Sequence, residues 1–334
     1  GDVFFSVESF PEYGKLSKQS IEELQSGARI DINEQKHHPL DFVLWKKQKP
    51  GEPAWESPWG LGRPGWHIEC SAMSTRYLGD SFDIHSGGSD LIFPHHENEI
   101  AQAEAATGQQ FVKYWLHNGY LLIDKEKMSK SLGNFLTVRK AREKYSPLAI
   151  RYFMLSAHYR SPINFSEEGL NQATGAVERL RNCWSDLQYA KETRAQEEKE
   201  GTRAFVEEIR QADSKFHEEM NDDFNTAGAL GSVFEVVRLA NTYLKENNTL
   251  DPEACSAIET FFKKVDSIMG IINLESEGSS GDIDIAEIER LIQERANARK
   301  AKDFAKSDAI RDKLALKGII LEDTPEGTKW KKEL

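Results

Sequence analysis

The stretch FDIHSGGSDLIFPHHENEIAQ, residues 82–102, contains a short strand, a turn and a helix in direct succession. Residues 82–85 are apolar enough for a strand, and the glycines and serines of residues 86–90 favour a turn at its carboxyl end. Pro94 suits the first turn of a helix through residues 95–102. Because ligands of open parallel sheets bind at the carboxyl ends of strands, this stretch predicts an α/β layer with a ligand site in the turn.

Amino-terminal to this stretch the pattern remains mixed. Residues 1–7 favour a strand, Ser17 is expected to cap a short helix that ends at Gly27, and residues 41–46 (DFVLWK) favour an apolar strand. The segment GEPAWESPWGLGRPGW, residues 51–66, is too rich in Pro and Gly for regular structure. It is also too aromatic for a passive linker, so we expect a loop with a role of its own.

Carboxyl-terminal to Phe165 the apolar residues recur at helical spacing, which favours bundle helices. Two faces can be read: Phe205, Ile209, Ala212 and Phe216 on one, and Leu230, Val233, Phe234, Val237 and Leu244 on another. Residues 275–284 are polar and Gly/Ser-rich, as in a linker. Helices over residues 285–301 and onward to residue 316, followed by the strand-like GIILED, complete the chain. The sequence therefore predicts an α/β part followed by a mainly α part and a small α+β unit.

Composition limits the class of protein. With 334 residues and 39 % hydrophobic content, the chain can form two or more packed domains. It has no long apolar run and no signal-peptide pattern at its start, so we expect a cytoplasmic protein without membrane contact. Cys70, Cys183 and Cys255 are too few and too scattered for a disulfide framework, so each is a buried thiol or a metal ligand.

A net charge of −12 argues against a general polyanion binder, because non-specific nucleic-acid affinity requires basic surface. Any RNA contact must therefore be local. The basic clusters at residues 299–302 and 329–332 are the candidates, and solvated surface is the alternative for both.

Residues 127–131 read KMSKS and are followed by Leu-Gly-Asn. Lys127 and Lys130, three residues apart on a loop, can contact the phosphates of ATP and neutralise charge that develops at the α-phosphate during adenylate formation. We therefore predict both lysines as catalytic. A solvated basic loop is the alternative, but a complete five-residue match is rare by chance.

His95 and Glu99 are separated by one helical turn, so both side chains project from the same face of the predicted helix. Together with Cys70 upstream they offer one imidazole, one carboxylate and one thiolate, which are three ligands of a tetrahedral zinc ion. Taken alone, a His and a Glu at this spacing are more often an exposed pair on a helix surface.

KMSKS is the signature of class I aminoacyl-tRNA synthetases, and further blocks narrow the resemblance. GWHIECSAM (residues 65–73), residues 82–102 and KMSKSLGN together resemble the cysteinyl-tRNA synthetase family. The similarity continues through RYFMLSAHYRSPINFS (151–166), DDFNT (222–226) and ARKAKDFAKSDAIRDKL (298–314). It covers essentially the whole chain, and several long blocks in the right order are more specific than any single motif.

The resemblance implies the second half of a Rossmann-like nucleotide-binding domain followed by helical and anticodon-recognition parts. The expected boundaries are the remainder of an insertion (connective peptide) region at 1–62, the second half of the catalytic domain at 63–110, a stem-contact region with the KMSKS loop at 111–170, a helix-bundle tRNA-binding domain at 171–274, a linker at 275–284 and an anticodon-recognition domain at 285–334.

The resemblance also implies the activity, which is ATP-dependent activation of cysteine and its transfer to tRNA-Cys. Zinc, one ion per chain, is held by Cys70, His95 and Glu99 and by a fourth ligand from a cysteine near the family's N-terminus, and it selects the substrate thiolate; magnesium accompanies ATP. Trp66 matches the aromatic residue beside the substrate side chain, although it could equally be a packing anchor. The implied ATP-binding residues are His85, Gly87, Gly88, Asp90, Lys127, Met128, Ser129 and Lys130.

In the same family the far end of the chain reads the anticodon. The matching positions here are Arg299, Asp308, Asp323 and Trp330, with Phe304 where a tryptophan can occur. A flipped base stacks on an aromatic ring, while Arg or Asp reads its hydrogen-bonding edge. Without the resemblance, this region is a solvated helix with a buried Phe.

The HIGH-type motif of the family and its N-terminal cysteine do not occur in these residues. We therefore expect a monomer that begins inside the insertion and is inactive without the N-terminal part of the same protein. Two alternatives stay open: the related ligase that joins cysteine to a sugar amine in mycothiol synthesis, and a catalytically silent tRNA-binding fragment. The basic ARKAKDFAKSD segment argues against the first, and the intact KMSKS argues against the second.

Overall fold

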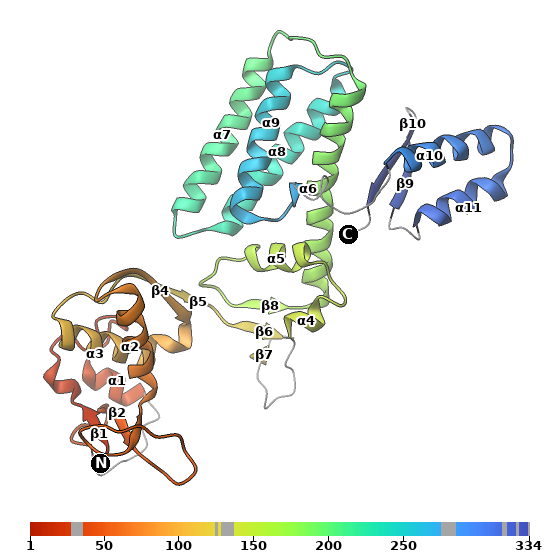
Figure 1. The fold of residues 1–334 in the computed structure, drawn as a ribbon. Coiled ribbons are helices and arrows are strands. Elements are labelled where there is room, and N and C mark those ends of the chain that lie inside the picture. The colour runs from red at the N-terminus through yellow and green to blue at the C-terminus, as the bar shows by residue number, and fades with distance from the viewer. Residues whose placement is uncertain are drawn as a thin grey trace. The chain divides into compact units, whose positions relative to one another are not determined.

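A computed structural model describes residues 1–27, 36–123, 126–127, 137–274, 285–315, 319–324 and 327–332 (Figure 1). The chain divides into two compact units. Unit 1 comprises Gly1–Phe135, Met154–Gly169 and Glu218–Gly228, and unit 2 comprises Leu136–Phe153, Leu170–His217 and Ala229–Leu334. Both units contain helices and small sheets. Among the described residues, no helix combines the length and apolar character needed to cross a membrane.

Unit 1 begins with an antiparallel sheet of order β1-β2-β3. Its elements are β1 (Val3–Phe5), the 3-10 turn Val7–Ser9, α1 (Ile21–Gly27), β2 (Phe42–Lys47) and β3 (Gly62–Pro64). The segment predicted to be irregular, residues 51–66, is therefore partly regular, since it contains β3 and a bridge between Trp55 and Gly62. Cross-strand hydrogen bonds override the low strand propensity of its Pro and Gly residues.

The prediction that Ser17 caps the first helix is wrong. Ser20 is the cap: its Oγ accepts from the backbone N–H of Glu23 at 3.3 Å, and the Glu23 carboxylate accepts from the Ser20 N–H at 2.8 Å. Ser17 instead donates its backbone N–H to Oε2 of the fully buried Glu97 at 2.9 Å. A buried carboxylate from a distant helix thus competes successfully with local capping.

The α/β layer of unit 1 follows. It consists of α2 (Trp66–Leu78), β4 (Phe82–Gly88), the 3-10 turn Ser89–Leu91, the π-helical turn Ile92–His96, α3 (Glu97–Thr107) and β5 (Val112–Asn118). Strands β4 and β5 are parallel and α3 is the crossover between them, which confirms the α/β prediction. Phe82, Ile100, Phe111 and Val112 form its core. The expected turn at residues 86–90 begins later, because β4 continues to Gly88.

A third small sheet in the described part of unit 1 has the order β7-β6-β8. Its strands are β6 (Leu121–Ile123), β7 (Glu126–Lys127) and β8 (Ile163–Phe165), with β6 antiparallel to β7 and parallel to β8. The chain therefore reaches the KMSKS segment from a strand edge.

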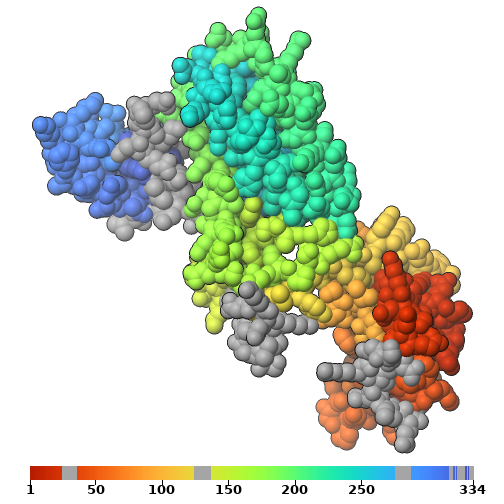
Figure 2. All heavy atoms as spheres, turned by 180° about the vertical axis from the view of Figure 1, so that it is seen from behind, coloured from red at the N-terminus to blue at the C-terminus, as the bar shows by residue number. Residues whose placement is uncertain are grey.

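Unit 2 is mainly helical. The helices that contribute to it are α4 (Val138–Ala141), α5 (Pro147–Leu155), α6 (Glu167–Thr193), α7 (Thr202–Asn221), α8 (Thr226–Glu246) and α9 (Pro252–Met269). Trp184 of α6 packs against Phe262 of α9, and Phe205 of α7 stacks on Tyr243 of α8. Figure 2 shows the atoms of this helical part, coloured green to cyan, as one continuous mass. The apolar stripes read from the sequence are therefore the bundle core.

The end of unit 2 is the predicted α+β piece. It contains α10 (Ile285–Lys300), α11 (Phe304–Ala315), β9 (Ile319–Thr324) and β10 (Gly327–Lys332), and the two strands form an antiparallel hairpin. Ile288, Leu291, Ile310, Leu314 and Ile319 form its core. The linker predicted at residues 275–284 lies outside the described residues.

Asp251 ties the start of α9 to the start of α7 and is 3 % exposed. Its carboxylate accepts from the backbone N–H groups of Glu253 at 2.8 Å, Ala254 at 3.2 Å and Lys199 at 2.8 Å, and from Thr202 Oγ1 at 2.7 Å. We expect Asp251→Ala to lower the free energy of unfolding by about 2–4 kcal/mol, because four donors, those of Thr202 and Ala254 in buried contacts, lose a charged acceptor. Chemical denaturation followed by circular dichroism measures this.

The matched control is Glu253→Ala, an exposed position in the same turn, which should change the free energy by less than about 0.5 kcal/mol. Burial raises the pKa of Asp251, but its hydrogen bonds lower it by more, so the folded pKa lies below the unfolded one. The stabilisation is therefore present above the unfolded pKa and lost as pH falls through the folded pKa. Equal losses for both variants would contradict the capping role.

Candidate functional site

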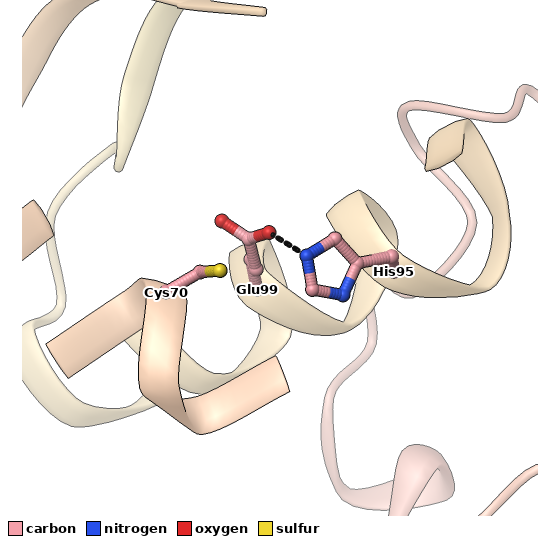
Figure 3. A group of neighbouring side chains, drawn as sticks. All are labelled: Cys70, His95 and Glu99. Carbon is pink, nitrogen blue, oxygen red and sulfur yellow. Dashed lines mark ion pairs between the residues drawn. The ribbon is translucent and has the colours of Figure 1, made fainter. Parts of the chain in front are cut away.

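Cys70, His95 and Glu99 lie together although two elements and a connecting turn supply them (Figure 3). Cys70 is in the second turn of α2, His95 lies in the π-helical turn before α3, and Glu99 is in the first turn of α3. One potential ligand atom from each lies within 4.8 Å of the others. His95 Nε2 is 2.8 Å from Glu99 Oε1, and both side chains are buried, so they are not an exposed helix pair.

Glu99 uses its two carboxylate oxygens differently. Oε2 shares a hydrogen bond of 2.9 Å with Nε2 of His85. Oε1, although close to His95, has no hydrogen-bond partner of acceptable geometry among the described residues. Burial raises the pKa of Glu99, but the rings of His85 and His95 lower it by more, to about 2. Glu99 is thus an ionised buried carboxylate with one oxygen held and the other available to a cation.

Three histidines that the sequence analysis did not place in the site surround this group. Nδ1 of His67 is 2.8 Å from Nδ1 of His95, and Nδ1 of His96 is 2.8 Å from Nε2 of His117. Burial lowers the pKa of both His67 and His96 to about 4, so both are neutral at pH 7. No local pattern signals His67 or His117, because each contact joins separate elements.

A second group, His85, His96 and Glu99, shares the same carboxylate. Its members are already engaged with each other or with His117. The ring of His96 also fills the space beside Gly87, where a Cβ would lie 2.6 Å from its Cε1. The Cys70 group has the available carboxylate oxygen and adds a sulfur, so it is the better cation site.

The donor set of the Cys70 group fits zinc, which accepts S, N and O ligands together. Tetrahedral bonds of about 2.0–2.3 Å place ligand atoms roughly 3.3–3.8 Å apart, within the spread of this group. Burial, together with Glu99 and Glu69, raises the pKa of the Cys70 thiol, and a bound cation is what restores the thiolate. Cys183 and Cys255 are buried in α6 and α9 as ordinary thiols.

Trp66 begins α2 and covers one side of the site. Its ring stacks on His95, with centroids 4.4 Å apart and planes at 22°, yet the residue remains 59 % exposed. One face of the indole therefore packs on the ring of His95, while much of the side chain remains exposed.

The residues expected at the nucleotide are arranged differently from the predicted turn. Gly87 and Gly88 are the last residues of β4, paired with His117 and Asn118 of β5, and Asp90 lies in the 3-10 turn that follows. His85 pairs with Glu99. They remain at the carboxyl end of a parallel strand, the usual place for a nucleotide, but Gly87 is also required by the ring of His96.

The residues predicted to be catalytic and to contact the phosphates of ATP lie mostly outside the described part of the chain. Lys127 is the last residue of β7, and its side chain, as well as Met128, Ser129 and Lys130, lie in the part that the structure does not describe.

The anticodon candidates lie at the end of unit 2. Arg299 is in the last turn of α10, and Phe304, 63 % exposed, begins α11 with Asp308 one helical turn later. Phe304 is therefore not the buried residue that the motif alone suggests. Trp330 of β10 is half-buried against the core of this piece, and Asp323 is in β9, its side chain outside the described part.

Comparison with known proteins gives the relationship. A family model described as the tRNA synthetases class I (C) catalytic domain matches residues 1–175. The Cysteine--tRNA ligase of Brevibacillus brevis is 51 % identical over 100 % of this chain and 70 % of its own length. The chain belongs to the cysteine--tRNA ligase family. The Bacillus velezensis member is 52 % identical over 99 % of this chain and 70 % of its own length, and that of Geobacter sulfurreducens is 50 % identical over 99 % and 71 %.

Other family parts match separately. A DALR domain matches residues 215–273, and a Cysteinyl-tRNA ligase anticodon binding domain matches residues 285–330. An anticodon-binding unit weighs against the sugar-amine ligase. Among solved structures, LeuRS of Agrobacterium radiobacter, in a ternary complex with tRNA and LeuAMS, matches with a TM-score of 0.54 and 15 % identity over 72 % of this chain and 37 % of that chain. This likeness shows a shared class I synthetase fold.

Proposed function

We propose that this chain, together with a further segment of the same protein, carries out the ATP-dependent ligation of cysteine to tRNA-Cys. In the first step a carboxylate oxygen of cysteine attacks the α-phosphorus of ATP, the bond to the β-phosphate breaks, and pyrophosphate leaves. In the second step a terminal ribose hydroxyl of the tRNA attacks the carbonyl carbon, loses its proton and displaces AMP. The observation that carries the proposal is the group formed by the half-buried Cys70 and the buried His95 and Glu99, in a chain about 50 % identical to cysteine--tRNA ligases.

Cys70, His95 and Glu99 are the proposed ligands of one zinc ion per chain, with the fourth ligand from outside the described residues. When bound, zinc supplies a soft Lewis acid that prefers the thiolate of cysteine to the hydroxyl of serine. His85 holds one oxygen of Glu99 and so orients the carboxylate. His67 and His96 lie beside the proposed ligands, and because burial lowers the pKa of each ring to about 4, neither adds positive charge there at pH 7.

The substrate and ATP sites adjoin this group. Trp66, stacked on His95, offers its open face to the cysteine side chain. His85, Gly87, Gly88 and Asp90 form the proposed adenosine side, and Lys127, Met128, Ser129 and Lys130 are the proposed contacts of the phosphates, with magnesium accompanying ATP. Catalysis is by positioning and electrostatic stabilisation, because the reaction needs no nucleophile from the protein.

The anticodon side is proposed at the exposed end of the α10–α11 pair. Phe304 is exposed and offers a ring for stacking, and Asp308 follows one turn along the same face of α11. Arg299 and Asp323 are proposed to read base edges. Trp330 is proposed to support the anticodon side, since it packs against the hydrophobic core formed by α10, α11 and β9.

A further segment of the same protein is the proposed partner of the α/β layer. The chain spans about 70 % of the length of its relatives. In the part of the chain that the structure describes, β4 pairs with β5 alone, and large apolar side chains are exposed around it. They are Met73, Tyr77 and Leu78 of α2, Ile84 of β4 and Tyr114 of β5. An exposed apolar patch beside an open strand edge suits added strands and helices, and we propose a monomeric complex with that segment.

We expect cysteine-dependent ATP–pyrophosphate exchange to be absent for this chain alone and to appear when the remaining segment of a close relative is supplied, because contacts from both parts form one site. Serine should support exchange at least about 10³-fold less well than cysteine. Light scattering of the mixture reports the one-to-one complex. Complemented protein that exchanges neither amino acid, while both parts are folded and associated, would overturn the assignment.

A further inference from the structure

A second cluster of buried polar side chains lies on the side of α3 that faces away from Glu99. Glu97 is fully buried and Asn98 is 2 % exposed, and the proposed function assigns no role to either residue. Glu97 and Glu99 are two residues apart, which is about 200° around a helix axis, so their side chains leave α3 on opposite sides. Because acidic side chains are rarely buried unless they are paired, the partners of Glu97 indicate what this side of the helix does.

The partners of Glu97 are backbone donors of one loop. Its Oε1 accepts from the N–H of Gly14 at 3.0 Å and from that of Leu16 at 3.4 Å, and its Oε2 accepts from the N–H of Ser17 at 2.9 Å. All three donors belong to residues 10–17, which we call the anchor loop, and they lie 80 to 83 positions before Glu97 in the sequence. One carboxylate therefore joins α3 to a distant part of the chain.

Two more contacts join the anchor loop to α3. The Tyr13 hydroxyl donates to Oδ1 of Asn98 at 2.5 Å in a buried contact, and the Lys15 ammonium forms an ion pair with Glu104. Glu97 and Glu104 are seven residues apart, about two helical turns, so they share one face of α3. The anchor loop therefore holds α3 along that face and not at a single point.

The anchor loop is fixed by its own hydrogen bonds. Gly14 has φ +98°, and a Cβ at this position would lie 2.1 Å from the backbone oxygen of Gln19, so glycine is required there. The Gly14 oxygen accepts from the Gln19 N–H at 3.3 Å and from Ser17 Oγ at 3.2 Å, and the Tyr13 N–H donates to Phe10 O at 3.0 Å. The loop thus presents its N–H groups in fixed directions, as a preformed site for one carboxylate.

The opposite side of α3 packs against α2, which carries Cys70. Ser71 Oγ donates to the backbone oxygen of Glu99 at 3.4 Å in a buried contact. A side-chain end lies roughly 5–6 Å from its helix axis, so a roll of α3 by about 10° would move the Glu99 carboxylate by about 1 Å. Ligand atoms of a metal site must lie within about 0.2 Å of their ideal distances. Zinc binding at this group therefore requires that α3 does not roll.

We propose that Glu97 is a positioning residue of the zinc site. By accepting three N–H groups of the anchor loop, Glu97 fixes the roll of α3 and hence the place of Glu99 relative to Cys70. The inference rests on the proposed function, because that function makes Glu99 and Cys70 zinc ligands. If Glu97 served only to satisfy the donors of the loop, its loss would lower stability, but the zinc affinity of the folded molecules would not change. The two roles therefore predict different results.

The test uses the full chain in complex with the remaining segment of a close relative. Competition with a chromogenic chelator gives the zinc affinity, and the visible absorption of Co(II) bound in place of zinc reports the ligand geometry. Glu97→Gln keeps the shape of the side chain but replaces one acceptor oxygen by a donor. It should weaken zinc binding by about 10- to 100-fold and change the Co(II) spectrum. In ATP–pyrophosphate exchange its KM for cysteine should rise, while its KM for ATP stays the same.

Two further variants make the result specific to the anchor. Tyr13→Phe removes the hydroxyl that Asn98 accepts from, and it should weaken zinc binding by about 5-fold, the equivalent of one hydrogen bond. Glu12→Gln is the matched control, because it makes the same chemical change in the anchor loop at a side chain that is 67 % exposed. This control should keep the parental zinc affinity and Co(II) spectrum.

Circular dichroism verifies that each variant is folded at the temperature of measurement, and Tyr13→Phe decides the question if Glu97→Gln does not fold. Folded variants with the parental zinc affinity and Co(II) spectrum would overturn the inference, and so would an equal loss in Glu12→Gln. If the parent complex binds no zinc, or if Cys70→Ala binds it as the parent does, the proposed zinc site itself fails, and this inference with it.

Discussion

Replacement of Cys70 by alanine is expected to weaken zinc binding by about 10²- to 10³-fold. Structural zinc sites bind with roughly 10–16 kcal/mol, so one of four ligands accounts for about 3–4 kcal/mol. Dialysed protein should then fall from about one zinc per chain to a small fraction of that, by atomic emission, and competition with a chromogenic chelator gives the affinity. Cysteine-dependent exchange in the complemented protein should fall with it.

The matched control is Cys255→Ala, which removes a buried cysteine of α9 that is not a proposed ligand, and this variant should keep its zinc. His85→Ala tests the orienting role separately. Because His85 holds only the second oxygen of Glu99, the loss of affinity should be smaller, about 10- to 100-fold. If Cys70→Ala keeps full zinc while His85→Ala and His96→Ala lose it, the ion belongs to the alternative group.

The order of strands and helices was predictable wherever a local pattern was strong. The helices beginning at Ile285 and Phe304 and the strand that follows them agree with the structure within about two residues, because apolar spacing and end signals coincide there. Ser17 was assigned wrongly because the acceptor that uses its N–H, Glu97, is eighty positions away. The Trp55 and Gly62 bridge was missed for a similar reason, since strand partners outweigh the propensities of Pro and Gly.

Some residues of the candidate site could be predicted from local sequence patterns, and others could not. The relation of His95 to Glu99 follows from helix geometry alone, but that of Cys70 to either residue required the family resemblance. His67 and His117 could not be found, because each is defined by a contact between separate elements. Gly87 was selected for a nucleotide, whereas the structure shows a second reason for glycine in the ring of His96. Burial and pairing, rather than residue type, turn these side chains into one site.

Lys130→Ala is expected to lower the rate of cysteine-dependent ATP–pyrophosphate exchange by about 10²- to 10³-fold in the complemented protein. The lysine acts where negative charge develops at the transferred phosphoryl group, and removal of one such donor costs this much in comparable sites. Lys127→Ala should show a loss of the same kind. Zinc content should remain at one ion per chain, since neither lysine is a ligand, and the KM for cysteine should change little.

Two comparisons make this result specific to the loop. Lys140→Ala removes an exposed lysine of α4 that is ten positions along the sequence from Lys130, and it should leave exchange unchanged, because the effect of a single exposed positive charge is screened by solvent. Lys130→Arg keeps the charge but not the compact ammonium group, so it should recover only part of the rate. A Lys130→Ala enzyme with the parental exchange rate would show that residues 127–131 are surface loop, whatever their motif. An equal loss in Lys140→Ala would instead assign the effect to net charge, because position on the loop would then make no difference.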